Sequence, residues 1–226
     1  RSGNITMRTS YTLQFADGTG SNPTAAQNLI ATDAPNLRTI YPFSYDQRHQ
    51  IVTTLDYRYG QGKDYNGPML GSREILKNTG LNLVANFASG TPYSRQEKIT
   101  GAALISAPTP ILAGEPFGSR KPWQFRTDMQ IDKNIVVSFG EDKKKKANLN
   151  IYLLVRNLFD TQNILSVYRA TGNVNDDGYL NAASFQNSIA TQNNEEAFRY
   201  YYALKADNPY NYGIPRQIRL GVKLDF

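Results

Sequence analysis

Few residues in this chain could carry out catalysis. His49 is the single histidine and there is no cysteine, which excludes disulfides, thiolate metal sites and cysteine nucleophiles. A lone histidine just before a strand is more often a hydrogen-bonding structural residue than a base or a ligand. Because we also find no serine paired with a base, we expect no catalytic residues and no enzymatic activity.

Carboxylates and arginines occur in pairs two positions apart. Asp56 precedes Arg58, and Arg126 precedes Asp128. In a strand, this spacing places both members of a pair on one face, about 7 Å apart. Acid–base chemistry could use such pairs, but we interpret them as ion pairs along a polar wall.

Residues 173–178 imitate the start of a calcium-binding loop. Oxygen-bearing side chains occupy its first, third and fifth positions before Gly178, but Ser184 stands where such a loop needs a bidentate glutamate. We therefore predict a polar turn, with no metal and no cofactor. Residues 16–20 contain glycines but lack the strand-then-helix context of a phosphate loop, so they are predicted to begin a loop.

Tyrosine is unusually common, with 15 Tyr against 10 Phe and 1 Trp. Many tyrosines stand with Phe198 among amide and carboxylate residues in the last long connection. Such a surface suits the binding of sugars or peptides by stacking and hydrogen bonding, and it suits the self-packing of a large loop equally well. The candidate substrate-binding residues are Tyr93, Tyr179, Tyr200, Tyr201, Tyr202, Tyr210 and Tyr212.

The elements that position these residues are strands. Apolar and polar residues alternate with period two in six segments, a pattern typical of strands with one apolar and one polar face. The segments are residues 5–15, 50–59, 81–88, 123–132, 149–156 and 217–226. The best helical candidate, residues 194–206, is polar and rich in tyrosine. We predict an all-β fold over a single domain, residues 1–226.

If the strands cross a membrane, the charged residues on one face determine which face contacts lipid. A charge costs about 2–4 kcal/mol at the bilayer midplane, so the apolar side would face lipid and the polar side a wet interior, the lumen. In a soluble β-sandwich the apolar side would instead pack on a second sheet, and the alternation alone does not separate the two. The expected lipid-facing residues include Met7, Leu13, Leu55, Leu83, Met129, Leu153 and Leu220. The expected lumen-facing residues are Arg8, Asp56, Arg58, Arg126, Asp128, Arg156 and Arg219.

Composition and spacing favour the membrane alternative. Mean hydropathy is −0.52 and no apolar run approaches 18 residues, which excludes a transmembrane helix but not strands of about 9–11 alternating residues. The connections run long, shorter, long, short and long, as in barrels with periplasmic turns and extracellular loops. The net charge of +6 is scattered apart from residues 143–146, a lysine run predicted to be a solvated turn, so we expect no nucleic-acid partner.

Aromatic residues and one lysine fit the same orientation. The aromatic residues lie toward strand ends on the apolar side, as in the interfacial girdles of membrane barrels; they are Tyr11, Phe15, Tyr57, Tyr59, Phe87, Trp123, Phe125 and Phe226. Lys133 falls on the apolar side, and strand geometry places it at the inner interface, where a lysine is tolerated.

Several segments resemble a known family. Residues 42–49 (PFSYDQRH), 88–93 (ASGTPY) and 155–160 (VRNLFD) are similar to loop-to-strand junctions of TonB-dependent outer-membrane receptors. The last strand, from Gly213 to the aromatic Phe226, resembles the final strand of that family. Residues 168–172 (YRATG) and 177–180 (DGYL) resemble the branch with a carboxypeptidase-regulatory-like leader domain, akin to the SusC-like receptors.

The resemblance implies a 22-stranded barrel, a plug domain and energy from the TonB complex. It also implies a SusD-like surface lipoprotein as partner. Six strands are fewer than the roughly eight that close the smallest barrels, so we expect the chain to be the C-terminal part of a barrel, without the plug. We expect a cell outer-membrane location and uptake of a bulky nutrient.

Two other functions stay open. The chain could be a structural barrel subunit of a larger assembly, such as a secretion or barrel-insertion complex, without uptake. A soluble carbohydrate-binding β-sandwich explains the tyrosines but not the rhythm of the connections. Phe226 is expected to act as a C-terminal insertion signal, since strand-edge recognition combines main-chain bonds with an aromatic anchor.

Overall fold

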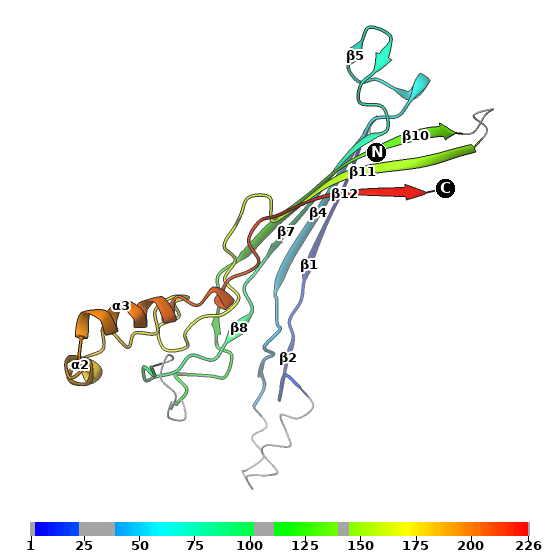
Figure 1. Cartoon of the computed structure of the whole chain (residues 1–226). Helices are drawn as coiled ribbons and strands as arrows, with labels where there is room; N and C mark the ends of the chain where they lie inside the picture. The colour runs from blue at the N-terminus through cyan, green and yellow to red at the C-terminus, as the bar shows by residue number, and fades with distance from the viewer. Residues whose placement is uncertain (1–2, 23–38, 102–110, 140–144, 226) are drawn as a thin grey trace.

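The computed structural model describes residues 3–22, 39–101, 111–139 and 145–225. Its main element is one antiparallel sheet in which neighbouring strands are consecutive in the chain (Figure 1). The strands, in sheet order, are β1 (Ile5–Leu13), β4 (His49–Arg58), β7 (Thr79–Ala88), β10 (Gln124–Phe139), β11 (Lys145–Arg156) and β12 (Gln217–Asp225). The prediction of an all-β fold built on six antiparallel strands is therefore confirmed.

The register lines up the apolar residues of all six strands. One row pairs Ile5, Tyr57, Leu81, Ile131, Leu153 and Leu220 across the sheet. The next row pairs Met7, Leu55, Leu83, Met129, Val155 and Ile218. Because side chains alternate between the faces of a strand, these rows define an apolar face, and the residues between them define a polar face.

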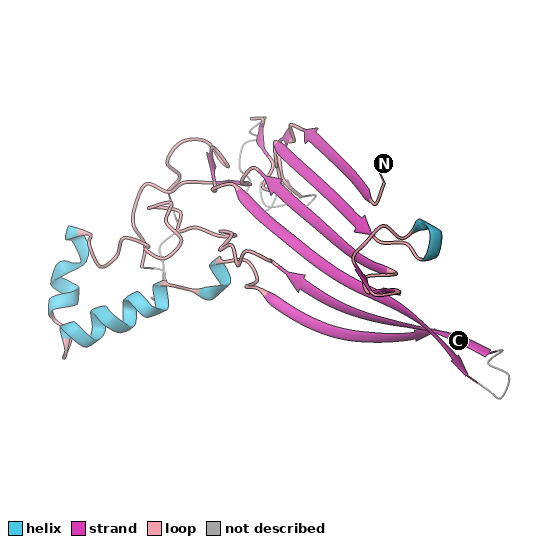
Figure 2. Ribbon diagram, turned by 90° about the horizontal axis from the view of Figure 1, so that it is seen from above, coloured by secondary structure: helices cyan, strands magenta, loops and turns pink. Residues whose placement is uncertain are grey.

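Connections of very different size leave the two ends of the sheet (Figures 1 and 2). At one end, the loop end, residues 14–48, 89–123 and 157–216 connect the strands. They contain the short pairs β2 (Asp17–Gly18) with β3 (Tyr41–Pro42) and β8 (Pro92–Tyr93) with β9 (Ser119–Arg120). At the other end, the turn end, lie η1 (Gly62–Asp64) and the pair β5 (Met69–Leu70) with β6 (Arg73–Glu74).

The third loop carries the helices. They are η2 (Ala183–Phe185), α2 (Gln186–Ala190), α3 (Glu195–Ala206) and η3 (Pro209–Asn211). The Asn194 side chain caps α3 by accepting the Ala197 N–H at 2.9 Å, which satisfies one of the unpaired amides of the first turn. We call residues 168–212 the loop module; it lies beyond the loop end, away from the sheet (Figure 2).

On the described part of the sheet the buried apolar residues are Ala88, Ala147 and Val155, whereas the other buried apolar side chains gather in the loop module. Within the described residues they form one cluster of Tyr179, Ile189, Tyr202 and Ala206, with Ile99, Leu180, Phe185 and Phe198 packed around it. On the sheet's apolar face, by contrast, Met7 is 61% exposed and Leu220 76%. In the part of the chain that the structure describes, no helix and no second sheet covers that face.

One expectation about the secondary structure needs correction. β10 runs on to Phe139 and β11 begins at Lys145, so the last two lysines of the run at 143–146 belong to a strand; the first two lie outside the described residues. The helical candidate at residues 194–206 does form a helix, α3. The described strands form an open sheet with β1 and β12 as its two edges, and the 22-stranded barrel stays a prediction.

No helix in the described ranges is long and apolar enough to cross a membrane.

Candidate functional site

An ion pair spans three strands of the polar face, at the turn end of β4 and β7. Arg58 donates two hydrogen bonds to the Asp132 carboxylate, at 3.1 and 2.9 Å. β7 lies between the two strands, and there the register places Gly80 between Arg58 and Asp132. A Cβ at Gly80 would lie 2.5 Å from the Arg58 guanidinium, so a glycine is needed for the arginine to reach across.

The spacing of charges in the sequence did not indicate Asp132 as the main partner of Arg58. Asp56 lies farther away, at 3.8 Å from the Arg58 Nε. The signal that could have revealed the pair was Gly80 inside a strand, since an interior glycine often marks a close approach. Gly221, in the same row, is covered in the same way by the Tyr152 ring.

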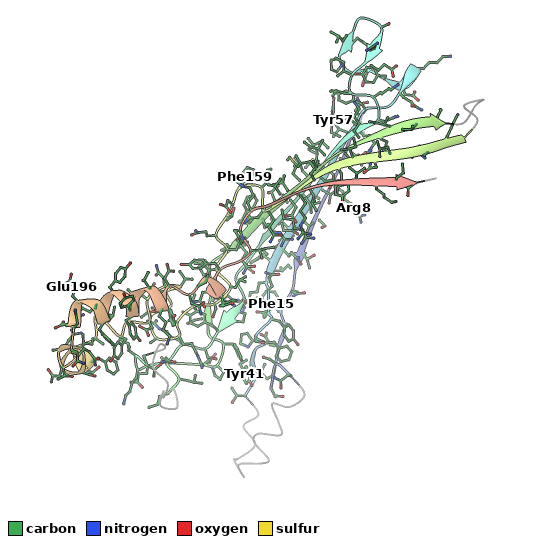
Figure 3. All side chains as sticks on the ribbon, in the orientation of Figure 1. Arg8, Phe15, Tyr41, Tyr57, Phe159 and Glu196 are labelled. Atoms are coloured by element: carbon green, nitrogen blue, oxygen red, sulfur yellow. The ribbon has the colours of Figure 1, made fainter. Side chains whose placement is uncertain are left out.

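The predicted lumen-facing residues share the polar face. The register places Arg8, Asp56, Arg58, Arg126, Asp128 and Arg219 on it, and alternation from Val155 adds Arg156. Both predicted ion pairs form, with Arg126 and Asp128 at 3.2 Å. Arg8 lies exposed on the edge strand (Figure 3). Asp128 also accepts the Asn157 N–H at 3.0 Å, which fixes the end of β11.

A buried carboxylate joins the first two loops to the sheet. Asp46 is fully buried; it accepts the Ala16 N–H at 3.0 Å and an Arg120 hydrogen bond, and the Arg48 Nε lies 3.4 Å from it. Burial alone raises the pKa of a carboxyl group. Here the Arg120 and Ala16 hydrogen bonds and the charges of Arg120 and Arg48 outweigh burial and lower the pKa of Asp46.

His49 is part of a row of rings at the loop end of the apolar face. Its Nδ1 lies 2.9 Å from the Tyr11 hydroxyl, which confirms the predicted structural hydrogen bond. The imidazole stacks on Trp123, and Trp123 on Phe87, with centroids 5.6 and 4.8 Å apart. Phe87, Phe125 and Phe159 continue the row toward β11.

The tyrosines proposed for substrate binding divide into two groups. Tyr179 and Tyr202 are buried and stacked on each other at 4.7 Å, so they pack the loop module and present no binding surface. Tyr200, Tyr201 and Tyr210 are exposed by 62%, 67% and 88%.

The other two tyrosines, Tyr93 and Tyr212, are intermediate in solvent exposure. Tyr93 lies in β8, and its hydroxyl would lie 2.9 Å from a Cβ at Gly172. Tyr212 donates to Asp207 at 3.2 Å; burial and this hydrogen bond raise its pKa.

Residues 173–178 form the predicted polar turn. The carboxylates of Asp176 and Asp177 accept the N–H groups of Gly178 and Tyr179 at 2.8 and 3.0 Å. The second oxygen of Asp177 accepts the Tyr202 hydroxyl at 2.6 Å. These oxygens therefore bind the turn to the core of the loop module.

A cavity of about 400 Å³ opens on the polar face where the three loops leave the sheet. Amide side chains dominate its lining, including Gln47, Gln50, Asn86, Gln124 and Asn163. These five amide residues were not among the binding residues predicted from the sequence. The available signal was the recurrence of amides at polar-face positions close to the loop ends of β4, β7 and β10.

Comparison with known proteins adds no family. No family model, curated protein or solved structure matches the chain. The resemblance to TonB-dependent receptors thus stays a prediction, as does the role of Phe226, which lies outside the described residues.

Proposed function

We propose that this chain forms part of the transmembrane barrel of a TonB-dependent outer-membrane receptor that takes up a bulky nutrient. The observation that carries the proposal is the contrast between the faces of the sheet. Apolar rows cross all six strands and are most exposed on the edge strands, where Met7 is 61% and Leu220 76% exposed, whereas Arg8, Asp56, Arg58, Asp128 and Asp132 lie on the other face. A lipid-facing wall around a polar interior needs this division.

The lysine on the apolar face is consistent with the proposal. Lys133 lies near the turn end, beside Thr79, and its Nζ donates to the Ile75 carbonyl at 2.6 Å. Long lysine side chains near a membrane interface direct their charge out of the apolar layer in this way. The apolar face of β10 therefore contains no unpaired ammonium group at this position.

The stagger of the strands supports a tilted barrel wall. The mid-points of β1 and β12 are Thr9 and Gly221. Followed through the register, Gly221 lies level with Asn4, whose carbonyl accepts the Arg58 N–H. Measured along β1, the strand mid-point therefore shifts by five residues, from position 9 to position 4, over the five steps from β1 to β12. One residue per step, at about 3.3 Å along and 4.8 Å between strands, corresponds to a tilt of about 35°, within the range of outer-membrane barrels.

Aromatic rings near both ends of the strands agree with two membrane interfaces. The row from Tyr11 to Phe159 lies at the loop end, and Tyr57 contacts Tyr59 near the turn end, with centroids 5.1 Å apart (Figure 3). Tyrosine and tryptophan favour the headgroup level because each combines an apolar ring with a polar group. The large loops would then be extracellular, where a receptor first meets its ligand.

Uptake, the TonB complex, the plug domain and a SusD-like lipoprotein enter the proposal through the sequence resemblance. The cavity below the loops favours a binding role over a purely structural subunit, since a scaffold has no use for a hydrogen-bonding cavity on its inner face.

Fractionation of cells that produce the protein tests the proposal. We expect the protein in the outer membrane, with heat-modifiable electrophoretic migration, and growth on its nutrient that requires both the protein and TonB. A protein recovered in the soluble fraction would refute the membrane assignment. Correct insertion with TonB-independent growth would refute the uptake assignment alone.

A further inference from the structure

The cavity below the loops contains hydrogen-bonding groups that the fold does not use. Asn163 has a structural role, since it both donates to and accepts from the Phe125 main chain at 2.8 Å. Gln47 and Gln124 each donate from Nε2 to a loop carbonyl, Ser89 and Ile164 respectively. Their Oε1 atoms make no hydrogen bond to the described residues, so both glutamines retain an acceptor.

Two further amides have no structural role in the described part of the chain. Gln50 and Asn86 make no side-chain hydrogen bond to any described residue, yet both line the cavity. A carboxamide carries a donor and an acceptor side by side. It can therefore pair with a group that presents an acceptor and a donor in turn.

The register fixes the spacing of these amides. Gln50, Ala88 and Gln124 form one row across three strands, so the two glutamines stand about 10 Å apart with a small alanine between them. Asn86 lies two positions before Ala88, about 7 Å along β7. The same distance separates residues i and i+2 of an extended peptide.

The remaining lining narrows the ligand class. Among the described lining residues there is no carboxylate, and the one cation, Arg126, is paired with Asp128 at 3.2 Å. Phe125 lines the cavity, but its ring lies on the opposite face against Phe87, so no described aromatic ring offers a stacking surface for a sugar. Leu165 and Ile214 supply aliphatic walls.

We propose that this cavity binds the main chain of an extended, neutral peptide, with Gln50, Asn86 and Gln124 pairing with its N–H and C=O groups. The inference rests on the proposed function, because the polar face is accessible to a nutrient only as the interior of a receptor. It names peptides as the class that this wall recognises. The aliphatic walls accept small apolar side chains, and main-chain pairing makes recognition independent of sequence.

The test compares two double variants of the protein, extracted in detergent from the outer membrane. Gln50→Ala with Asn86→Ala removes two amides that make no hydrogen bond to described residues. The control, Thr54→Ala with Asn82→Ala, changes the same face of the same strands outside the cavity. The probes for calorimetry are penta-alanine, acetylated and amidated at its ends, and maltopentaose.

We expect blocked penta-alanine to bind, and the cavity variant to weaken its binding about tenfold, as the loss of two hydrogen bonds predicts. The control variant should remain within about twofold of the unchanged protein. No binding of the peptide by correctly inserted protein, or equal loss in both variants, would overturn the proposal. So would binding of maltopentaose that is weakened only by the cavity variant, which would assign the cavity to saccharides. A protein absent from the outer membrane would instead refute the proposed function.

Discussion

The loop module and the sheet differ in how far their apolar side chains are exposed to solvent. In the loop module Ile189 is fully buried and Tyr179 is 2% exposed, although Tyr200, Tyr201, Leu204 and Tyr210 lie on its surface. On the sheet Ile218 is 65% exposed and Met7 61%. Because both regions belong to one chain, the overall composition of the protein does not explain the difference in exposure.

Under the proposed function, this contrast means that the two regions are built for different surroundings. The loop module follows the rule for water, in which apolar groups are removed from solvent and buried polar groups are paired. The sheet exposes contiguous apolar rows that would drive association or aggregation of a soluble protein. An apolar solvent on that side removes the conflict, and the polar face, with its ion pairs, then faces water.

The largest effect is expected where the two regions are joined. Asp46→Asn leaves Arg120 and Arg48 without their buried carboxylate, and breaking a buried ion pair costs about 3–5 kcal/mol. We expect residues 14–22 and 39–48 to become sensitive to protease while the sheet remains resistant. Limited proteolysis with mass spectrometry measures this, and equal resistance of variant and parent would exclude a joining role for Asp46.

The same contact predicts a pH dependence. The folded pKa of Asp46 is lowered, so its ionised form stabilises the fold fully above its unfolded pKa of about 3.9. This contribution is lost as the pH falls through the lowered folded value. Protease resistance of the loops should therefore decline below about pH 4 in the parent protein. The Asp46→Asn variant should lack that acid-dependent step.

The next largest effect distinguishes the two faces of the sheet. Leu83 lies at the middle of β7 on the apolar face, and Asn82 precedes it on the polar face. Leu83→Arg should reduce the amount of heat-modifiable protein in the outer membrane, since an arginine there costs about 2–4 kcal/mol. Asn82→Arg, opposite Asp56, should insert normally. Equal insertion of both variants would contradict a lipid-facing apolar side.

A smaller effect is expected inside the loop module. Tyr202→Phe removes the hydroxyl that Asp177 accepts at 2.6 Å, and a hydrogen bond to a charged group is worth about 1.5–3 kcal/mol. Hydrogen exchange should rise in α3 and around Tyr179 without a change in the strands. A change in the strands as well would show that the two regions do not unfold independently.

Alternation in the sequence predicted the sheet because each strand has one apolar face, so burial or lipid contact imposes period two. The strand ends were less predictable. β10 continues to Phe139 although Lys133 and Val136 break the alternation, because pairing with β11 rather than side-chain pattern extends it.

The contacts of the candidate site were less predictable from the sequence, because they too arise from tertiary pairing rather than from a local pattern. Arg120 and Asp46 meet across 74 positions of sequence, and the stacking of Tyr179 on Tyr202 joins segments with no periodic signal. The split of the tyrosines into buried and exposed groups follows from those tertiary contacts. Only the ion pairs two positions apart, such as Arg126 with Asp128, could be derived locally.

The most direct test of the lipid-facing apolar side is a nitroxide scan along β7. Because the chain has no cysteine, single cysteines at positions 81–87 each give one labelling site. In the protein reconstituted into lipid vesicles, we predict that odd positions are accessible to oxygen but not to a water-soluble nickel chelate, and that even positions show the reverse. High nickel accessibility at positions 81, 83, 85 and 87, or no alternation at all, would contradict the account.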